Sequence, residues 1–174
     1  MNKEIVYKIG GLKRPSVTKK QRLLLKLNKI PFVRNLQFIR SVFCRNFNLP
    51  LSVSYNKRFF SSATNLNVGE KVGLADTFIL AYAPVTIGEG TSFSFDNKII
   101  TSSHDFNDFS TIIAKPVAIG VNCWITTNVI ILPGVTIGDH TVIAPGSVVT
   151  KDIPSGVLAG GNPCKVIKEI NLVK

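Results

Sequence analysis

Two histidines, His104 and His140, are the side chains of this chain that titrate nearest to neutral pH. His104 lies in the string Thr101-Ser-Ser-His-Asp-Phe106, which lacks the repeat pattern of the sequence around it. Because loops on a rigid scaffold often carry chemistry, we take His104 as the first candidate and Asp105 as a candidate to orient its ring. His140 lies in the turn Gly138-Asp-His-Thr141, where we expect a solvent-exposed side chain without a role.

The cysteines and histidines do not form a metal-binding pattern. Cys44, Cys123 and Cys164 are odd in number, far apart and without CxxC spacing, which argues against a disulfide framework and against a zinc site. A three-histidine metal centre needs one histidine more than the chain contains. We therefore expect reduced thiols and no metal.

An aliphatic residue recurs every six positions in the C-terminal half of the chain. The positions are Ile119, Ile125, Ile131, Ile137, Ile143 and Val149, and the same period occurs earlier at Val68, Leu74 and Leu80, slips by one residue, and resumes at Ile87, Phe93 and Ile99. A period of six fits neither a helix face nor strand alternation. It predicts a three-sided coil in which each turn stacks on the next at about 4.8 Å and the aliphatic residues point inward.

The repeat has one interruption and one end. Thr101 to Pro116 has no hexapeptide pattern, which predicts a loop expelled from the coil. After the last repeat, Asn162 and Pro163 fit the N-cap and first position of a helix. We expect a short C-terminal helix to about residue 170, with three apolar residues to cover the open end of the coil: Val166, Ile167 and Ile170.

Residues 116–170 closely resemble the hexapeptide-repeat acyltransferases, in the branch that acetylates sugars, polysaccharides and some antibiotics. The strings that carry the resemblance are Cys123-Trp-Ile125, Leu132-Pro-Gly-Val-Thr-Ile-Gly138, Gly146-Ser-Val-Val-Thr-Lys-Asp-Ile-Pro154, Gly161-Asn-Pro163 and Lys165-Val-Ile-Lys168. The resemblance implies an all-β, left-handed parallel β-helix that forms a homotrimer, with acetyl-coenzyme A between neighbouring coils. It does not cover residues 1–60.

The resemblance also implies roles for particular residues. His104, five residues after Ile99, matches the family's general base, which takes the proton of the attacking hydroxyl. The backbone N–H of Thr127 matches the donor that stabilises the oxyanion. The residues that match cofactor-binding positions are Trp124, Thr127, Pro145, Thr150, Lys151, Lys165 and Lys168. Pro145 departs from the pattern because it has no N–H to offer.

The expected activity is O-acetylation of a sugar or of a cell-surface glycan precursor by direct transfer. Ala81-Tyr-Ala83 lacks the Asn/Asp pair expected of the small-sugar acetyltransferases, which argues against a simple galactoside or maltose acceptor. The alternatives are N-acetylation of an amino sugar nucleotide, acetylation of serine, and a coil that serves as a scaffold without catalysis.

The basic residues gather in the N-terminal third, which we treat as a segment separate from the β-helix domain of residues 61–174. Residues 1–60 hold fourteen Lys and Arg against one acid, Glu4, whereas residues 61–174 hold seven against nine. Apolar residues at helical spacing predict an amphipathic helical segment: Phe32, Leu36, Ile39 and Phe43.

Three uses of this basic segment stay open: packing on the coil, association with an anionic membrane surface, and nucleic-acid binding. The last is not expected, because no nucleic-acid-binding motif accompanies the charge. The chain has no apolar run of membrane-spanning length and no secretory signal pattern. We therefore expect a cytoplasmic protein, peripheral at the inner membrane face if the segment binds lipid.

Overall fold

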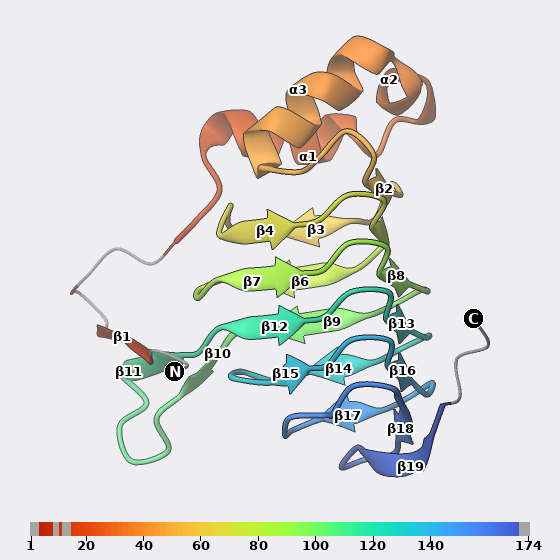
Figure 1. Ribbon diagram of the computed structural model, residues 1–174. Coiled ribbons are helices and arrows are strands. Elements are labelled where there is room, and N and C mark those ends of the chain that lie inside the picture. Colours follow the sequence, from red (N-terminus) through yellow and green to blue (C-terminus); the bar gives the residue numbers. More distant parts are fainter. Residues whose placement is uncertain (1–3, 9–10, 12–14, 171–174) are drawn as a thin grey trace.

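A computed structural model describes residues 4–8, 11 and 15–170, which form a three-sided parallel coil with helices at one end (Figure 1). The first side contains β2 (Ser54–Tyr55), β5 (Gly73–Ala75), β8 (Ser92–Phe93), β13 (Trp124–Ile125), β16 (Val142–Ile143), β18 (Val157–Gly160) and β19 (Lys165–Glu169). The second side contains β3 (Phe60–Ser61), β6 (Phe78–Leu80), β9 (Lys98–Ile100), β14 (Ile130–Ile131) and β17 (Val148–Val149). The third side contains β4 (Leu66–Val68), β7 (Val85–Ile87), β12 (Val117–Ile119) and β15 (Thr136–Ile137).

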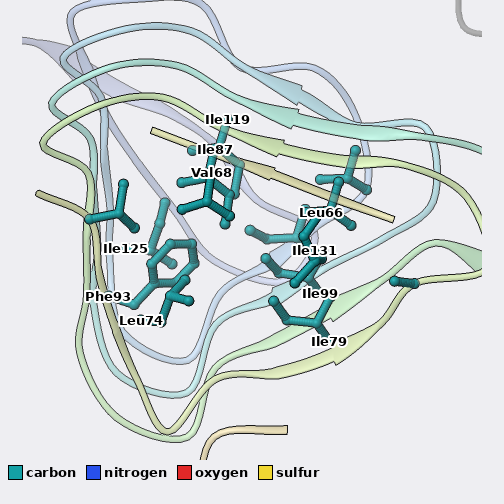
Figure 2. Packing of buried hydrophobic residues seen from close by; sticks show 14 of the residues in the cluster. Leu66, Val68, Leu74, Ile79, Ile87, Phe93, Ile99, Ile119, Ile125 and Ile131 are labelled. Atoms are coloured by element: carbon teal, nitrogen blue, oxygen red, sulfur yellow. The ribbon is translucent and has the colours of Figure 1, made fainter. Parts of the chain in front are cut away.

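The six-residue period produces the core. Along each side, register pairing stacks one aliphatic residue on the next, for example Ile87 on Ile119 and Ile119 on Ile137. Figure 2 shows these columns converging inside the coil. Leu80 was predicted to point inward, but Ile79 fills that position and pairs with Ile99, while Leu80 is partly exposed. The next inward residue comes five positions after Leu74 instead of six. Because Ile79 and Leu80 are both aliphatic, the spacing alone does not show which of them points inward.

Tight corners separate the sides. Asn122, Asn128 and His140 have φ values of 52°, 58° and 56°, in the left-handed region that asparagine and histidine tolerate better than most residues. The small or β-branched residues that the repeat places beside the corners are buried: Cys123, Val129, Val135, Thr141 and Ser147. His140 is therefore a corner residue, and its backbone N–H donates to the carbonyl of Val121 at 2.9 Å.

Three helices cover the first coil: α1 (Lys19–Leu27), α2 (Pro31–Asn35) and α3 (Gln37–Phe47). Thr18 and Gln21 form a capping box at the start of α1. The predicted apolar stripe is wrong as one continuous face, because the backbone is extended at Leu36 and the side chain of Phe32 is 78% exposed. Only Phe43 of that stripe is buried. The strands β2 and β3 already belong to the coil, so the coil begins before the boundary predicted at residue 61.

The predicted C-terminal helix is wrong. After β18, Gly161 with φ of 101° reverses the chain, and β19 returns antiparallel to β18. The last coil leaves the N–H and C=O groups of β18 unpaired on one edge, and β19 satisfies them. Val166 and Ile167 on this strand are 48% and 60% exposed, so they do not close the coil as expected.

A glycine column allows the coils to stack on the third side. A Cβ built on Gly120 would lie 2.6 Å from the backbone nitrogen of Asp139 in the next coil. We expect Gly120→Ala to cost about 1–3 kcal/mol through overpacking. Thermal unfolding should detect a melting temperature lowered by about 2–4 °C per kcal/mol. The exposed Val166→Ala should leave it unchanged, and an unaltered Gly120→Ala melting temperature would show that the coils separate at little cost.

Candidate active site

The segment between β9 on the second side and β12 on the third side is a β-hairpin rather than an irregular loop. It contains β10 (Ser102–His104) and β11 (Thr111–Ala114), and β11 also pairs antiparallel with β1 (Ile5–Lys8). The predicted expulsion from the coil is correct, since Figure 1 shows this small sheet projecting from the coil. His104 ends β10 and its side chain is exposed.

The imidazole of His104 is held by the hairpin itself. Its Nδ1 lies 2.7 Å from the carbonyl oxygen of Phe109. A carbonyl only accepts hydrogen bonds, so Nδ1 carries the proton and donates in the neutral ring. Nε2 then keeps its lone pair. This tautomer is the one that a general base acting through Nε2 requires.

Asp108 fixes the tip of the hairpin and with it the Phe109 carbonyl. Its carboxylate accepts hydrogen bonds from the Ser110 hydroxyl at 2.6 Å and from the Thr111 hydroxyl at 2.5 Å. These bonds hold the pKa of the Asp108 carboxyl below its usual value. Asp105 does not orient the imidazole, because its carboxylate accepts from the backbone N–H of Asn107 at 2.8 Å.

Removing the Asp108 carboxylate should loosen the support of His104. We expect Asp108→Ala to lower kcat by about tenfold, since small misplacements of a reacting group are costly. The melting temperature should hardly change, because the residue is exposed. Because the pKa of Asp108 is lowered, its ionised carboxylate supports the hairpin tip fully at pH values above the ordinary aspartate range. This support is lost only as the pH falls through the lowered pKa. Unchanged kcat in the variant at neutral pH would dismiss this role.

The N-terminal strand β1 clamps the hairpin onto the coil. Tyr7 is buried against Ala83 and Ile112, and its hydroxyl donates to the carbonyl of Tyr82 at 2.8 Å. Lys115 forms an ion pair with Glu4 at 3.2 Å. The stretch Ala81-Tyr-Ala83, which lacks the expected Asn/Asp pair, therefore serves for packing in this chain, because Ala83 is buried against Tyr7 of β1.

A pocket of about 420 Å³ opens beside His104. Its wall combines the hairpin with the next two coils on the second side, and it is lined among others by His104, Phe106, Lys115, Pro133 and Thr150. Of the residues predicted to bind the cofactor, Thr150 is the one that shares this pocket with His104. Ser102, Ser103 and Asn107 add polar groups to the same wall. The pocket can admit a polar group to the histidine.

A second group of predicted residues lies on the first side of the coil. Register pairing places Trp124, Val142, Leu158 and Lys168 in one column across β13, β16, β18 and β19. At about 4.8 Å per strand, Trp124 and Lys168 lie on the order of 14 Å apart. Lys165 lies on the same strand as Lys168, where a helix had been predicted. An extended ligand with phosphates at one end could lie along this column.

Thr127 and Pro145 lie at the corner between the first and second sides. The two coils meet there through a hydrogen bond from the Gly146 N–H to the Thr127 carbonyl at 3.0 Å. The Thr127 N–H finds no acceptor among residues 4–8, 11 and 15–170, and the residue is exposed. It is available to a ligand. Lys151 is exposed beside Thr150, at the opposite corner.

The predicted residues therefore form two groups at the two ends of the second side. His104, Thr150 and Lys151 lie at the corner where the second side ends, whereas Thr127 and Pro145 lie where it begins, next to the first side that holds Trp124, Lys165 and Lys168. Pro133 follows Thr127 by six residues, a span of at most about 20 Å in an extended chain. One chain does not bring the groups together.

The cysteines lie in the interior of the fold, apart from the pocket beside His104. In the described part of the chain, no group of three His, Cys, Asp or Glu side chains could hold a metal ion. Cys44, Cys123 and Cys164 are free and buried, and burial raises the pKa of each thiol. These thiols are packing residues.

The sequence did not reveal the group that orients His104. The Phe109 carbonyl is a backbone atom, so no side-chain type marks it. Asp108, followed by Ser110 and Thr111, is a recognisable turn signal that could have identified the tip. The role of β1 depends on pairing between distant segments and leaves no local pattern.

Comparison with protein families gives one match in sequence. Residues 111–151 match the family described as bacterial transferase hexapeptide (six repeats). The galactoside O-acetyltransferase of Escherichia coli (strain K12) is 39% identical over 119 residues, which cover 65% of this chain and 58% of that relative. The match thus spans somewhat more than half the length of the relative.

Solved structures match over more of the chain. A maltose O-acetyltransferase from Clostridium difficile 630 superimposes with a TM-score of 0.80 and 31% identity, covering 88% of this chain and 86% of that one. A galactoside acetyltransferase in complex with coenzyme A gives a TM-score of 0.74 and 29% identity, covering 87% and 80%. The likeness confirms the predicted left-handed parallel β-helix.

Proposed function

The chain belongs to the hexapeptide-repeat acyltransferases, and from that premise we propose that it transfers the acetyl group of acetyl-coenzyme A to a hydroxyl of a sugar or glycan. The observation that carries the proposal is the exposed His104 imidazole, which lines the pocket and whose Nδ1 is hydrogen-bonded to the Phe109 carbonyl, so that Nε2 keeps its lone pair. The coenzyme A complex of the galactoside acetyltransferase supports the choice of donor.

In the proposed reaction His104 moves one proton. Nε2 takes the hydroxyl proton as the acceptor oxygen attacks the thioester carbonyl carbon, so the hydroxyl gains nucleophilicity only as its bond forms. The carbonyl oxygen becomes an oxyanion and receives a hydrogen bond from the Thr127 N–H. When the carbon–sulfur bond breaks, the imidazolium returns the proton to sulfur. The products are an acetyl ester and free coenzyme A, and no acyl-enzyme forms.

The column on the first side supports a binding wall for the donor. Trp124 is 52% exposed and its indole N–H donates to the Ser94 hydroxyl at 3.2 Å, which fixes the ring. Lys165 and Lys168 lie toward the far end, where they would meet the phosphates as point charges. Pro145 supplies a rigid corner without an N–H.

A homotrimer would complete the site. The two groups of residues lie at opposite ends of the second side, so a neighbouring copy related by rotation can bring its Thr127 corner to the His104 corner of the first. This arrangement uses His104 and Thr150 from one chain with Trp124 and Thr127 from the next. An isolated chain should then be inactive.

The proposed function is tested by release of coenzyme A thiol from acetyl-coenzyme A against sugars, nucleotide sugars, serine and cell-envelope glycans. We expect release that depends on a sugar or glycan hydroxyl, with an ester as product. Release with an amino sugar nucleotide that yields an amide, or with serine, would replace the proposed acceptor class. Failure to bind acetyl-coenzyme A at all would favour a scaffold role instead.

A further inference from the structure

The three helices form a cap, residues 19–51, over the open end of the first coil. Leu24 and Leu25 of α1, and Phe43 and Phe47 of α3, are buried in the same cluster as the interior of the coil. The faces opposite these residues therefore look away from the coil, beyond its end (Figure 1).

The cap exposes large apolar side chains that the fold does not use. At helical spacing, Leu23 on α1 and Phe38 on α3 stand on the faces opposite the buried residues. Phe32 and Phe38 are 78% and 76% exposed, and six large apolar residues of the cap are exposed in all: Leu23, Ile30, Phe32, Leu36, Phe38 and Leu51. Several exposed apolar residues on one part of the fold indicate an interaction surface.

The same surface is positively charged without compensation. The sequence has no acidic residue between Ile5 and Gly69, a stretch that carries thirteen Lys and Arg. Among the residues that the structure describes, no ion pair involves a basic side chain of the three helices. On α1, the exposed Lys19 lies one helical turn before the exposed Leu23.

A cationic pocket of about 300 Å³ lies where the cap meets the first coil. Four basic side chains line it around an apolar floor of Leu25, Phe59 and Phe60: Arg22, Lys26, Lys29 and Arg58. Of these, Arg58 already pairs with Asp76 and Asp96, so three cations are left to meet an anion. The pocket matches a phosphate next to an acyl chain.

We propose that the cap docks on a bilayer surface that contains anionic phospholipid. Basic, aromatic-bearing amphipathic helices bind in the interfacial plane, where apolar residues enter the acyl boundary and Lys and Arg meet the headgroups. Charge complementarity selects this occupant. No helix among the described residues is long and apolar enough to cross a membrane, so the cap would lie on the surface.

Docking fixes the height of the active site, a consequence that rests on the proposed function. His104 follows β9, which lies two strand steps from β3 on the second side. Two steps of about 4.8 Å and one helix layer of about 10 Å place His104 roughly 20 Å from the bilayer surface. An acceptor carried on a lipid would present its sugar, rather than its lipid, to this site.

Cosedimentation of the full chain with vesicles tests the docking. Vesicles of phosphatidylcholine mixed with phosphatidylglycerol should bind the chain at about 0.1 M salt, and about 1 M salt should weaken the binding strongly. Pure phosphatidylcholine should bind at least tenfold less. Absence of binding to the mixed vesicles, equal binding to both kinds, or preferential binding of single-stranded nucleic acid would overturn the proposal.

Matched variants locate the surface. Phe32→Ser with Phe38→Ser, and Lys26→Glu with Lys29→Glu, should each weaken binding tenfold or more. Lys26→Arg with Lys29→Arg should retain it, as should Val166→Ser with Ile167→Ser at the far end of the coil. Loss of binding in these controls, or full binding by the two test variants, would contradict the assignment. His104→Ala should bind vesicles like the wild type, so docking and catalysis can fail separately.

Discussion

His104→Ala is expected to lower kcat for acceptor-dependent release of coenzyme A by about 10²–10⁴-fold, the usual loss when a general base is removed. The affinity for acetyl-coenzyme A should stay within a few-fold of the wild type, because the imidazole lies on the hairpin and not on the column of Trp124 and Lys168. Steady-state kinetics and cofactor titration measure the two quantities separately.

The second histidine provides the matched control. His140 occupies a left-handed corner with φ of 56°, a conformation that asparagine tolerates. His140→Asn should therefore keep both its fold and its kcat. If His104→Ala retained more than about a tenth of the wild-type kcat, the claim that proton transfer by His104 contributes most of the rate would be wrong.

Two inactive variants are expected to restore activity when they assemble together. Thr127→Pro removes the proposed oxyanion donor and should lower kcat by about 10²–10³-fold. A chain with His104→Ala still offers its Thr127 corner, and a chain with Thr127→Pro still offers its His104 corner. In every trimer that contains both variants, one of the three junctions joins two intact halves, so purified mixed trimers should recover about a third of the wild-type activity.

Coexpression with different affinity tags, followed by purification of mixed assemblies, makes the measurement. Each variant alone is the control, and its melting temperature shows whether the coil still folds. Mixed assemblies that remain as inactive as the parents would place His104 and Thr127 in the same functional unit of one chain. That result would contradict the shared site while leaving the role of His104 intact.

The coil could be predicted from the sequence because its signal is local and repeated. Each inward aliphatic from Ile119 to Val149 follows the last by six residues, and stacking requires the same register in every turn. The prediction failed at Leu80, where two neighbouring aliphatic residues made the register ambiguous. It also failed at the C-terminus, where Asn162 and Pro163 match a helix start but the free edge of β18 recruits a strand.

The candidate site was predicted in part. The family resemblance predicted a role for His104, and in the structure this residue lines the pocket beside the hairpin. The same resemblance gave no sign that β1 would pair with β11, because that contact joins Ile5 to Ala114 across most of the chain. Asp105 was a poor candidate to orient the ring because it lies just after β10, where its carboxylate accepts a hydrogen bond from the Asn107 N–H.

The most direct test of the central claim, that His104 acts as a base through Nε2, is the ¹⁵N spectrum of the histidine rings above their titration range. With two histidines in the chain, His140→Asn leaves the signals of His104 alone. The hydrogen bond to the Phe109 carbonyl predicts a neutral ring protonated on Nδ1 and unprotonated on Nε2. A ring protonated on Nε2 would have no lone pair to offer the acceptor hydroxyl and would contradict the mechanism.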